Sequence, residues 1–434
     1  MYIPRRWRRL ALLALGAVLP SMLAAQADPA PGARAEPASE PRVRVFLDCH
    51  TGGCDRNFFV TELPFVLWTQ DRLDADVHAL ITGLGTAAGG TEITIVLLGR
   101  GLFGGRADTL RTAVPPNSSD DMRRRQLAQV LQLGLVPYAL RISGSARFTL
   151  RYDAPSDGAA PSEVIRDPWN FWVYRLRANG SGGAESLNSN YQLNGSVNVS
   201  RTTEDLKLSF NIYEEYRSNR FTLSDSTTPT YVLRSTDVSA RVVRSLTDHW
   251  SFGTRVTGGR SEFRNQQASA GIDLSAEYNV FPWRDATSRQ LIAAVALGGR
   301  YYDYNEPTIY ERLTESRPVA RAILAGESRQ QWGTIDASLR YTHFLHDAAT
   351  YNISFNGRAQ LRLTRGLSLE LRGDAARVND QLYLPRGGAS DEEVLTRQRA
   401  LATNFRVGGS VGLSFTFGSI YNTIVNPRLD ELGT

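Results

Sequence analysis

The sequence predicts a mainly β fold class: an antiparallel transmembrane β-barrel of about 12 strands, preceded by a small N-terminal α/β domain. Three observations predict it. The chain opens with an export signal, its second half alternates apolar and polar residues over long stretches, and the connections between those stretches alternate in length. The 42% hydrophobic content is typical of a soluble protein or of a barrel, so it does not choose between them.

The first 27 residues are typical of a secretory signal peptide. Most of residues 5–9 are arginines, and a short apolar run follows at residues 10–23. Ala25-Gln26-Ala27 then forms a candidate signal-peptidase cleavage site of small residues. The apolar run is too short to span a bilayer as a helix. A twin-arginine export signal is the alternative, but a barrel must reach its membrane unfolded. Residues 28–41, rich in Pro, Ala and Glu, are predicted to form a disordered linker.

Residues 42–150 predict one α/β domain, long enough to close a core of its own. Strands are expected at residues 42–48, 76–83, 92–99 and 107–114, with a glycine-rich turn at 85–90. A helix interrupted near Pro64 is expected over residues 57–72. A second helix over residues 119–140 begins with Ser118 or Ser119 as its cap. The element order and the segment DADVHALITG (74–83) resemble the N-terminal domain of the periplasmic protein TolB.

The two cysteines, Cys49 and Cys54, follow the first strand of this domain. In an oxidising compartment a disulfide is the default, and so short a loop would gain about 2 kcal/mol from it. The alternative is a metal site that adds His50 and Asp55, although no second ligand pair of suitable spacing follows. No lysine follows the glycines of residues 83–90 or 98–105, so they do not predict a phosphate loop. We therefore expect neither a metal nor a cofactor.

After a linker at residues 151–166, the barrel is predicted over residues 167–418, because the sequence there alternates with a period of two. Residues 272–280, 351–363 and 405–417 show it most clearly. Stretches of ten residues or more suit tilted membrane strands, whereas a soluble β-sandwich, the alternative, would have shorter ones. Strands are expected to begin near residues 169, 190, 205, 231, 250, 267, 290, 315, 332, 351, 367 and 403.

Connection lengths predict the orientation of the barrel. The short connections, at residues 202–204, 245–249 and 364–366, are predicted to face the periplasm, and the long ones, at 218–230 and 382–402, the outside. Two aromatic girdles are expected at the membrane interfaces. The periplasmic girdle comprises Trp169, Trp172, Trp250, Trp283 and Trp332. The outer one comprises Tyr213, Tyr216, Tyr301, Tyr302, Tyr304 and Phe344.

The chain also resembles an uncharacterised family of bacterial outer-membrane proteins with an exported α/β domain and a C-terminal barrel. The resemblance covers most of residues 43–429. The sequence segments that carry it are residues 167–175, 245–253, 277–283, 301–313, 381–395 and 417–429. It implies an outer-membrane location with the N-terminal domain in the periplasm, and no catalytic residues. The final strand resembles a barrel assembly signal through Phe415 and Phe417, but a tail, residues 419–434, follows it.

The predicted function is a structural, anchoring or pore role in the outer membrane. The barrel would contact lipid, and the periplasmic domain would bind an envelope protein. Nucleic acid is not expected as a partner outside the cytoplasm, despite the net charge of +5. The predicted lumen charges favour a weak anion preference, unless they pair and fill a narrow interior. They are Lys207, Arg241, Arg255, Asp273, Glu277, Asp336, Arg340, Arg358, Arg362, Glu370, Arg372, Asp374 and Arg406.

The alternative function is a barrel enzyme, phospholipase-like or protease-like. Its candidates are His343, His346 and Asp347, which would need a nearby serine to form a triad. No nucleophile motif accompanies them. The leading expectation is therefore that the chain is not an enzyme.

Overall fold

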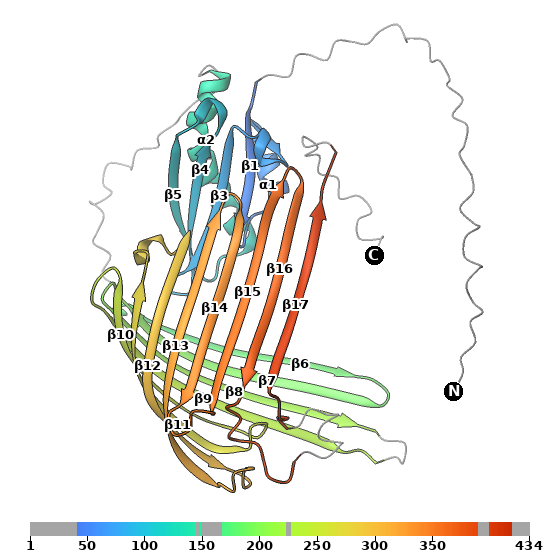
Figure 1. Cartoon of the computed structure of the whole chain (residues 1–434). Helices are drawn as coiled ribbons and strands as arrows, with labels where there is room; N and C mark the ends of the chain where they lie inside the picture. Colours follow the sequence, from blue (N-terminus) through green and yellow to red (C-terminus); the bar gives the residue numbers. More distant parts are fainter. Residues whose placement is uncertain (1–40, 145–147, 149–166, 223–226, 389–398, 419–434) are drawn as a thin grey trace, which may run out of the picture. The chain divides into compact units, whose positions relative to one another are not determined.

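The computed structural model describes residues 41–144, 148, 167–222, 227–388 and 399–418 (Figure 1). The predicted signal peptide, both linkers (residue 41 excepted) and the tail lie outside these ranges. The contacts place Arg42–Thr434 in one compact unit, which holds both sheets of the structure. No helix in the described ranges combines the length and the apolarity needed to cross a bilayer.

The N-terminal α/β domain, here called the head, is built on a five-stranded sheet with the strand order β2-β1-β3-β4-β5. Its strands are β1 (Val43–His50), β2 (Val66–Thr69), β3 (Val77–Gly85), β4 (Thr91–Gly99) and β5 (Ala107–Val114). β1 pairs in parallel with β2 and β3, and the other pairs are antiparallel. Helices α1 (Arg56–Glu62) and α2 (Asp120–Ser143) complete the head, with short 3-10 turns at Arg72–Asp74 and Gly101–Phe103.

Helix α2 covers the head sheet with one apolar face. Leu127, Leu131 and Leu135 recur every four residues and are fully buried. Gly134 permits the close approach of helix and sheet, because a Cβ there would lie 2.7 Å from Leu97 Cδ1. The Ser119 hydroxyl accepts a hydrogen bond from the Met122 N–H at 3.2 Å, which caps the helix as predicted.

The predicted helix over residues 57–72 is wrong in its second half. The helix ends at Glu62, and β2 follows after Pro64. Val66 and Trp68 alternate with the less buried Leu67 and enter the core beside β1. A period of two over four residues was too short to be distinguished from a helical pattern.

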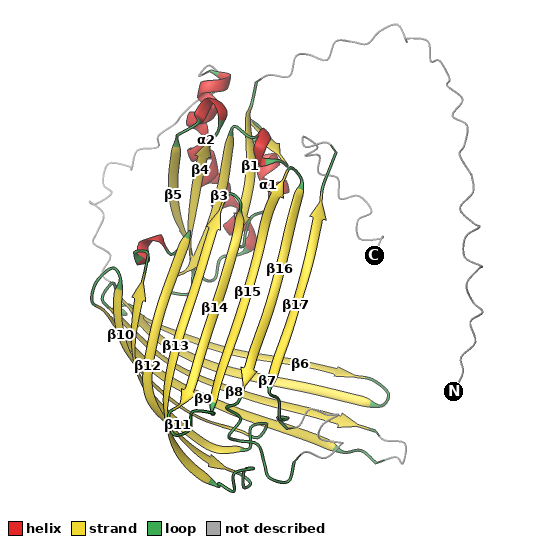
Figure 2. Ribbon diagram, viewed as in Figure 1, coloured by secondary structure: helices red, strands yellow, loops and turns green. Residues whose placement is uncertain are grey.

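The second sheet has twelve antiparallel strands in sequence order, each paired with the next (Figures 1 and 2). They are β6 (Trp172–Ala184), β7 (Asn188–Thr202), β8 (Leu206–Phe221), β9 (Thr230–Ser245), β10 (Trp250–Ser261), β11 (Gln266–Asn279), β12 (Arg289–Tyr304), β13 (Thr314–Gln330), β14 (Gly333–Phe344), β15 (Tyr351–Thr364), β16 (Leu367–Val378) and β17 (Phe405–Phe415). A 3-10 turn, Trp283–Asp285, precedes β12. The predicted fold class is confirmed, and every strand begins within three residues of its predicted start.

The predicted closure into a barrel is not present. β6 and β17 are the two edges of the sheet, and no pairing joins them among the described residues. Every residue of β17 is exposed. With an even number of strands, β6 and β17 run antiparallel, as closure requires. Alternation along a strand predicts which face a residue occupies, but it does not specify the register between the first strand and the last.

The large sheet exposes apolar side chains and encloses charged ones, which is the reverse of the usual arrangement in a soluble protein. On β11, Ile272 and Leu274 are 52% and 63% exposed, whereas Asp273 between them is 2% exposed. On β12, Val295 and Leu297 are exposed in the same way. We call the side that these side chains share the apolar face and the opposite side the polar face.

Two predictions need correction at the end of the large sheet that was predicted to face outside. β8 continues to Phe221, into the predicted loop at 218–230. The predicted outer girdle fails at Tyr213, Tyr302, Tyr304 and Phe344, which lie on the polar face instead of facing the membrane. The segment after β16 packs there too, because Leu382 is buried against Val319 and Phe344. Strand register decides the outcome, since only Tyr216 and Tyr301 of the predicted outer girdle lie on the apolar face.

Candidate functional site

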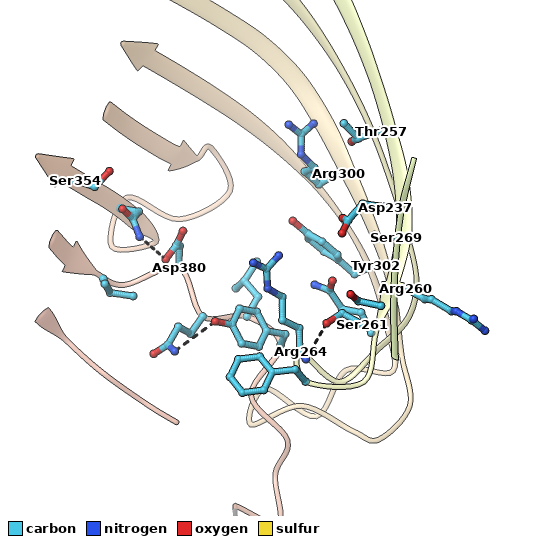
Figure 3. Close-up of a pocket in the computed structure, with 18 of the residues that line it drawn as sticks. Asp237, Thr257, Arg260, Ser261, Arg264, Ser269, Arg300, Tyr302, Ser354 and Asp380 are labelled. Atoms are coloured by element: carbon cyan, nitrogen blue, oxygen red, sulfur yellow. Dashed lines mark hydrogen bonds between the residues drawn. The ribbon is translucent and has the colours of Figure 1, made fainter. Parts of the chain in front are cut away.

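The polar face holds a cavity of about 1250 Å³. Side chains from β8–β12 and β14–β17 line it, together with the segment after β16 (Figure 3). In Figure 3, Arg300 and Tyr302 of β12 stand on one side, and Ser354 and Asp380 on the other. Period-two alternation places these side chains on one face, so the sheet itself builds the cavity.

Arginine outnumbers carboxylate on the cavity wall. Arg260 points away from the cavity (Figure 3) and pairs with Glu214 at 3.2 Å. Arg234 lies opposite Tyr216 on the apolar face, with its guanidinium 5.6 Å from the ring. Arg260 and Arg234 border the cavity but do not face it. The other charged lining residues are six arginines (Arg217, Arg255, Arg264, Arg300, Arg340 and Arg406) and four carboxylates (Glu215, Asp237, Asp374 and Asp380).

Asp273 of β11 is the most enclosed carboxylate of the polar face, and two arginines bind it. Arg300 donates to both carboxylate oxygens, at 2.9 and 2.8 Å, and Arg321 of β13 donates to one of them. Gly298, the residue directly opposite Asp273 on β12, leaves the space for this cluster. A Cβ at that position would lie 2.6 Å from the Asp273 Oδ1 atom.

The structure distributes the predicted lumen charges over three settings. Arg255, Arg340, Asp374 and Arg406 line the cavity. Glu370 accepts from Arg358 at 3.3 Å and from Arg372 at 2.7 Å. Strand alternation places Lys207, Arg241, Glu277 and Asp336 on the polar face as well. The sequence analysis missed Arg217, Arg264, Arg300, Arg321, Glu215, Asp237 and Asp380. Of these, Arg300 could have been found by extending the alternation of β12 towards Tyr302.

The last predicted lumen charge, Arg362, reaches the head instead. Asp48 of β1 is 2% exposed, and Arg362 Nη1 donates to it at 2.7 Å. The Nε2 atoms of His50 and His78 lie 2.9 and 3.0 Å from its two oxygens. Burial alone would raise the pKa of the Asp48 carboxyl, but hydrogen bonds from His50, His78 and Arg362 outweigh it and hold that pKa below its ordinary value.

A second set of contacts joins the head to the same end of the large sheet. Arg365, in the turn between β15 and β16, binds Asp71 at 3.1 Å and Asp74 at 2.6 Å. Arg72 donates to the Gln331 carbonyl, in the turn between β13 and β14, at 2.6 Å. We call these contacts and the Asp48 cluster the junction. It lies at the end predicted to be periplasmic from its short turns.

The tryptophans of the predicted periplasmic girdle lie at this end too. Trp172 and Trp250 begin β6 and β10, Trp283 lies before β12, and Trp332 lies directly before β14. Because consecutive strands alternate in direction, these positions share one end of the sheet. Trp169, Trp250, Trp283 and Trp332 are exposed.

The predicted disulfide is confirmed: Cys49 and Cys54 are bonded, with their Cα atoms 6.4 Å apart. The alternative metal site, which needed both thiolates, is therefore wrong. The bond pins the turn between β1 and α1. The Asp55 carboxylate instead accepts the Phe58 N–H at 3.0 Å as the cap of α1.

The residues proposed for an enzyme do not form a triad. Asp347 accepts from the Ala349 N–H at 3.0 Å and from the Thr350 hydroxyl at 2.9 Å, which stabilises its own loop. His343 Nδ1 lies 3.0 Å from the Tyr341 hydroxyl. Burial lowers the pKa of His346. No serine is hydrogen-bonded to His343 within the described ranges.

Comparisons with known proteins give little. No family model matches the chain, and no curated protein matches it in sequence. One similar solved structure is a NanC porin, at 13% identity, which covers 56% of this chain and 99% of the porin with a TM-score of 0.25. So low a score supports no argument about this chain, whose fold class rests on its own sheet.

Proposed function

We propose that the chain is an outer-membrane β-barrel that conducts small solutes with a weak preference for anions. The reversed sheet is the observation that carries this proposal. A contiguous set of exposed Leu, Ile, Val and Phe side chains on one face fits a lipid environment, and a charged opposite face fits a water-filled lumen. The strands, of 11 to 17 residues, are long enough to cross a bilayer when tilted.

The proposal includes closure of the sheet by pairing of β6 with β17. An open edge in the hydrocarbon region would leave backbone N–H and C=O groups without partners, which costs several kcal/mol for each group. β6 and β17 run in the antiparallel sense that the pairing needs. Membrane insertion therefore favours the closed form.

The proposed orientation places the head in the periplasm. The junction attaches the head to the turns between β13 and β14 and between β15 and β16, at the end of the sheet with the short connections. Short turns face the periplasm in bacterial barrels, and exposed tryptophans suit the interface beside them. Membership in the outer-membrane family and the TolB-like nature of the head stay predictions.

The anion preference rests on the six arginines and four carboxylates of the cavity wall. A net positive wall raises the local concentration of anions and lowers that of cations. Reversal potentials of the purified full chain, in planar bilayers under a KCl gradient, should therefore show anion selectivity. The double variant Arg264→Gln/Arg340→Gln should shift the reversal potential towards cation selectivity.

The matched control is Arg260→Gln, because this arginine lies near the cavity but points away from it. It should leave the reversal potential unchanged. Cation selectivity of the unaltered protein would contradict the charge argument. Absence of conductance would favour the second candidate, an anchor for a periplasmic partner, which the attachment of the head through Asp48 and Arg362 supports.

A further inference from the structure

A row of charged residues crosses the polar face on β9, β10 and β11. Arg241 lies directly opposite Arg255, and Arg255 lies directly opposite Asp273. Like charges directly opposite each other on neighbouring strands destabilise a sheet. The single carboxylate of the row would have to compensate both arginines.

Asp273 is already engaged from its other side. Arg300 donates to both of its oxygens, and Arg321 donates to Oδ2. Gly271 and Gly298 make room for this arrangement, since a Cβ at Gly271 would lie 2.7 Å from Arg300 Nη1. Two guanidinium charges therefore face one carboxylate before Arg241 and Arg255 are counted.

Among the described residues, Arg255 has no counter-ion of its own. Its Nε atom is buried without a hydrogen-bond partner, although the side chain lines the cavity. No carboxylate forms an ion pair with Arg255 or Arg241 in the part of the chain that the structure describes. A buried guanidinium N–H without an acceptor is costly, so the row favours an added acceptor.

We propose that Arg241 and Arg255 bind an oxyanion, the carboxylate or phosphate group of a small solute, on the lumen wall. A guanidinium presents a planar fork of N–H donors that matches two oxygens of either group. The bound oxyanion would supply the missing negative charge and accept from Arg255. This inference rests on the proposed function insofar as the solute reaches the row through the lumen.

The test measures binding of phosphate and of acetate to the full chain in detergent by titration calorimetry, and the rise in Tm that each ligand causes. Arg255→Gln and Arg241→Gln should each weaken binding roughly tenfold, as loss of a charged hydrogen bond does. Arg260→Gln, on the apolar face, should bind as the unaltered protein does. The anion that binds more tightly distinguishes a phosphate source from a carboxylate source.

Two results would overturn the inference: no saturable binding of either anion, or binding that both row variants retain. The Tm of each variant without ligand reports on its folding, and removal of a like charge should not lower it. The failures are also separable from those of the proposed function. If the unaltered protein binds an anion but does not conduct, and both row variants bind it more weakly, the oxyanion site alone is sustained. Anion-selective conductance with undiminished binding in both variants would sustain the pore alone.

Discussion

Asp48 connects the head to the large sheet through one carboxylate. Its partners come from two head histidines and from Arg362, 314 residues away in the sequence. Breaking a buried pair by removing one charge leaves the other uncompensated, which costs far more than an exposed pair gains. The carboxylate therefore contributes to stability only while all of its partners are in place.

Replacing Asp48 by Asn should destabilise the head by about 3 kcal/mol at neutral pH. Because the folded pKa of Asp48 is depressed, its contribution is present above the ordinary pKa of an aspartate and is lost as the pH falls through the folded value. Fluorescence of the buried Trp68 during urea unfolding at a series of pH values measures this. In the Asp48→Asn variant, the free energy of unfolding should fall less steeply as the pH is lowered.

The matched variant is Arg362→Met, which keeps the carboxylate and removes one set of its hydrogen bonds. The pKa of Asp48 should then rise, so that its contribution to the free energy of unfolding is lost at higher pH than in the unaltered protein. The same fall of the free energy of unfolding at low pH in the unaltered protein and in both variants would show that Asp48 does not govern the pH response.

At the scale of elements, the strands of the large sheet were predictable, because exposed apolar and inward polar residues repeat over more than ten positions. Residues 57–72 were not, because Val66 and Trp68 give only a fragment of a strand pattern. The junction was beyond prediction for a different reason. Nothing local to Asp48 or Arg362 indicates that the two side chains meet, and Arg362 was expected to face the lumen.

The edges β6 and β17 allow a direct test of closure. Leu176 and Leu413 are exposed on the apolar face, so cysteines on this face of both strands can meet if the edges pair. Leu176→Cys, combined in turn with Val411→Cys, Leu413→Cys or Phe415→Cys, should give an intramolecular disulfide in at least one combination. Mass spectrometry after non-reducing digestion identifies it.

Arg177→Cys serves as the control, because it lies on the opposite face of β6 and should not form these bonds. Cross-links that join two chains would show instead that the edges pair between molecules. The native Cys49–Cys54 disulfide leaves no free thiol to interfere.

At the scale of the whole molecule, the proposed orientation predicts which residues a membrane-impermeant thiol reagent reaches in intact cells. Thr228, exposed between β8 and β9, should be labelled as Thr228→Cys. Glu204, exposed in the turn between β7 and β8, should be labelled as Glu204→Cys only after the outer membrane is disrupted. Residues 224 and 390, within the predicted outer loops at 218–230 and 382–402, lie outside the described ranges. The opposite pattern would reverse the orientation and place the head outside the cell.

The junction also has a consequence for biogenesis. The head precedes the strands in the chain and is complete before residue 362 has been synthesised or folded into the sheet. Until β15 is in place, Asp48 has only His50 and His78 beside it, and its desolvation is not fully compensated. Completion of the head is thereby tied to assembly of strands far downstream, and a chain in which β15 has not folded should carry a less stable head.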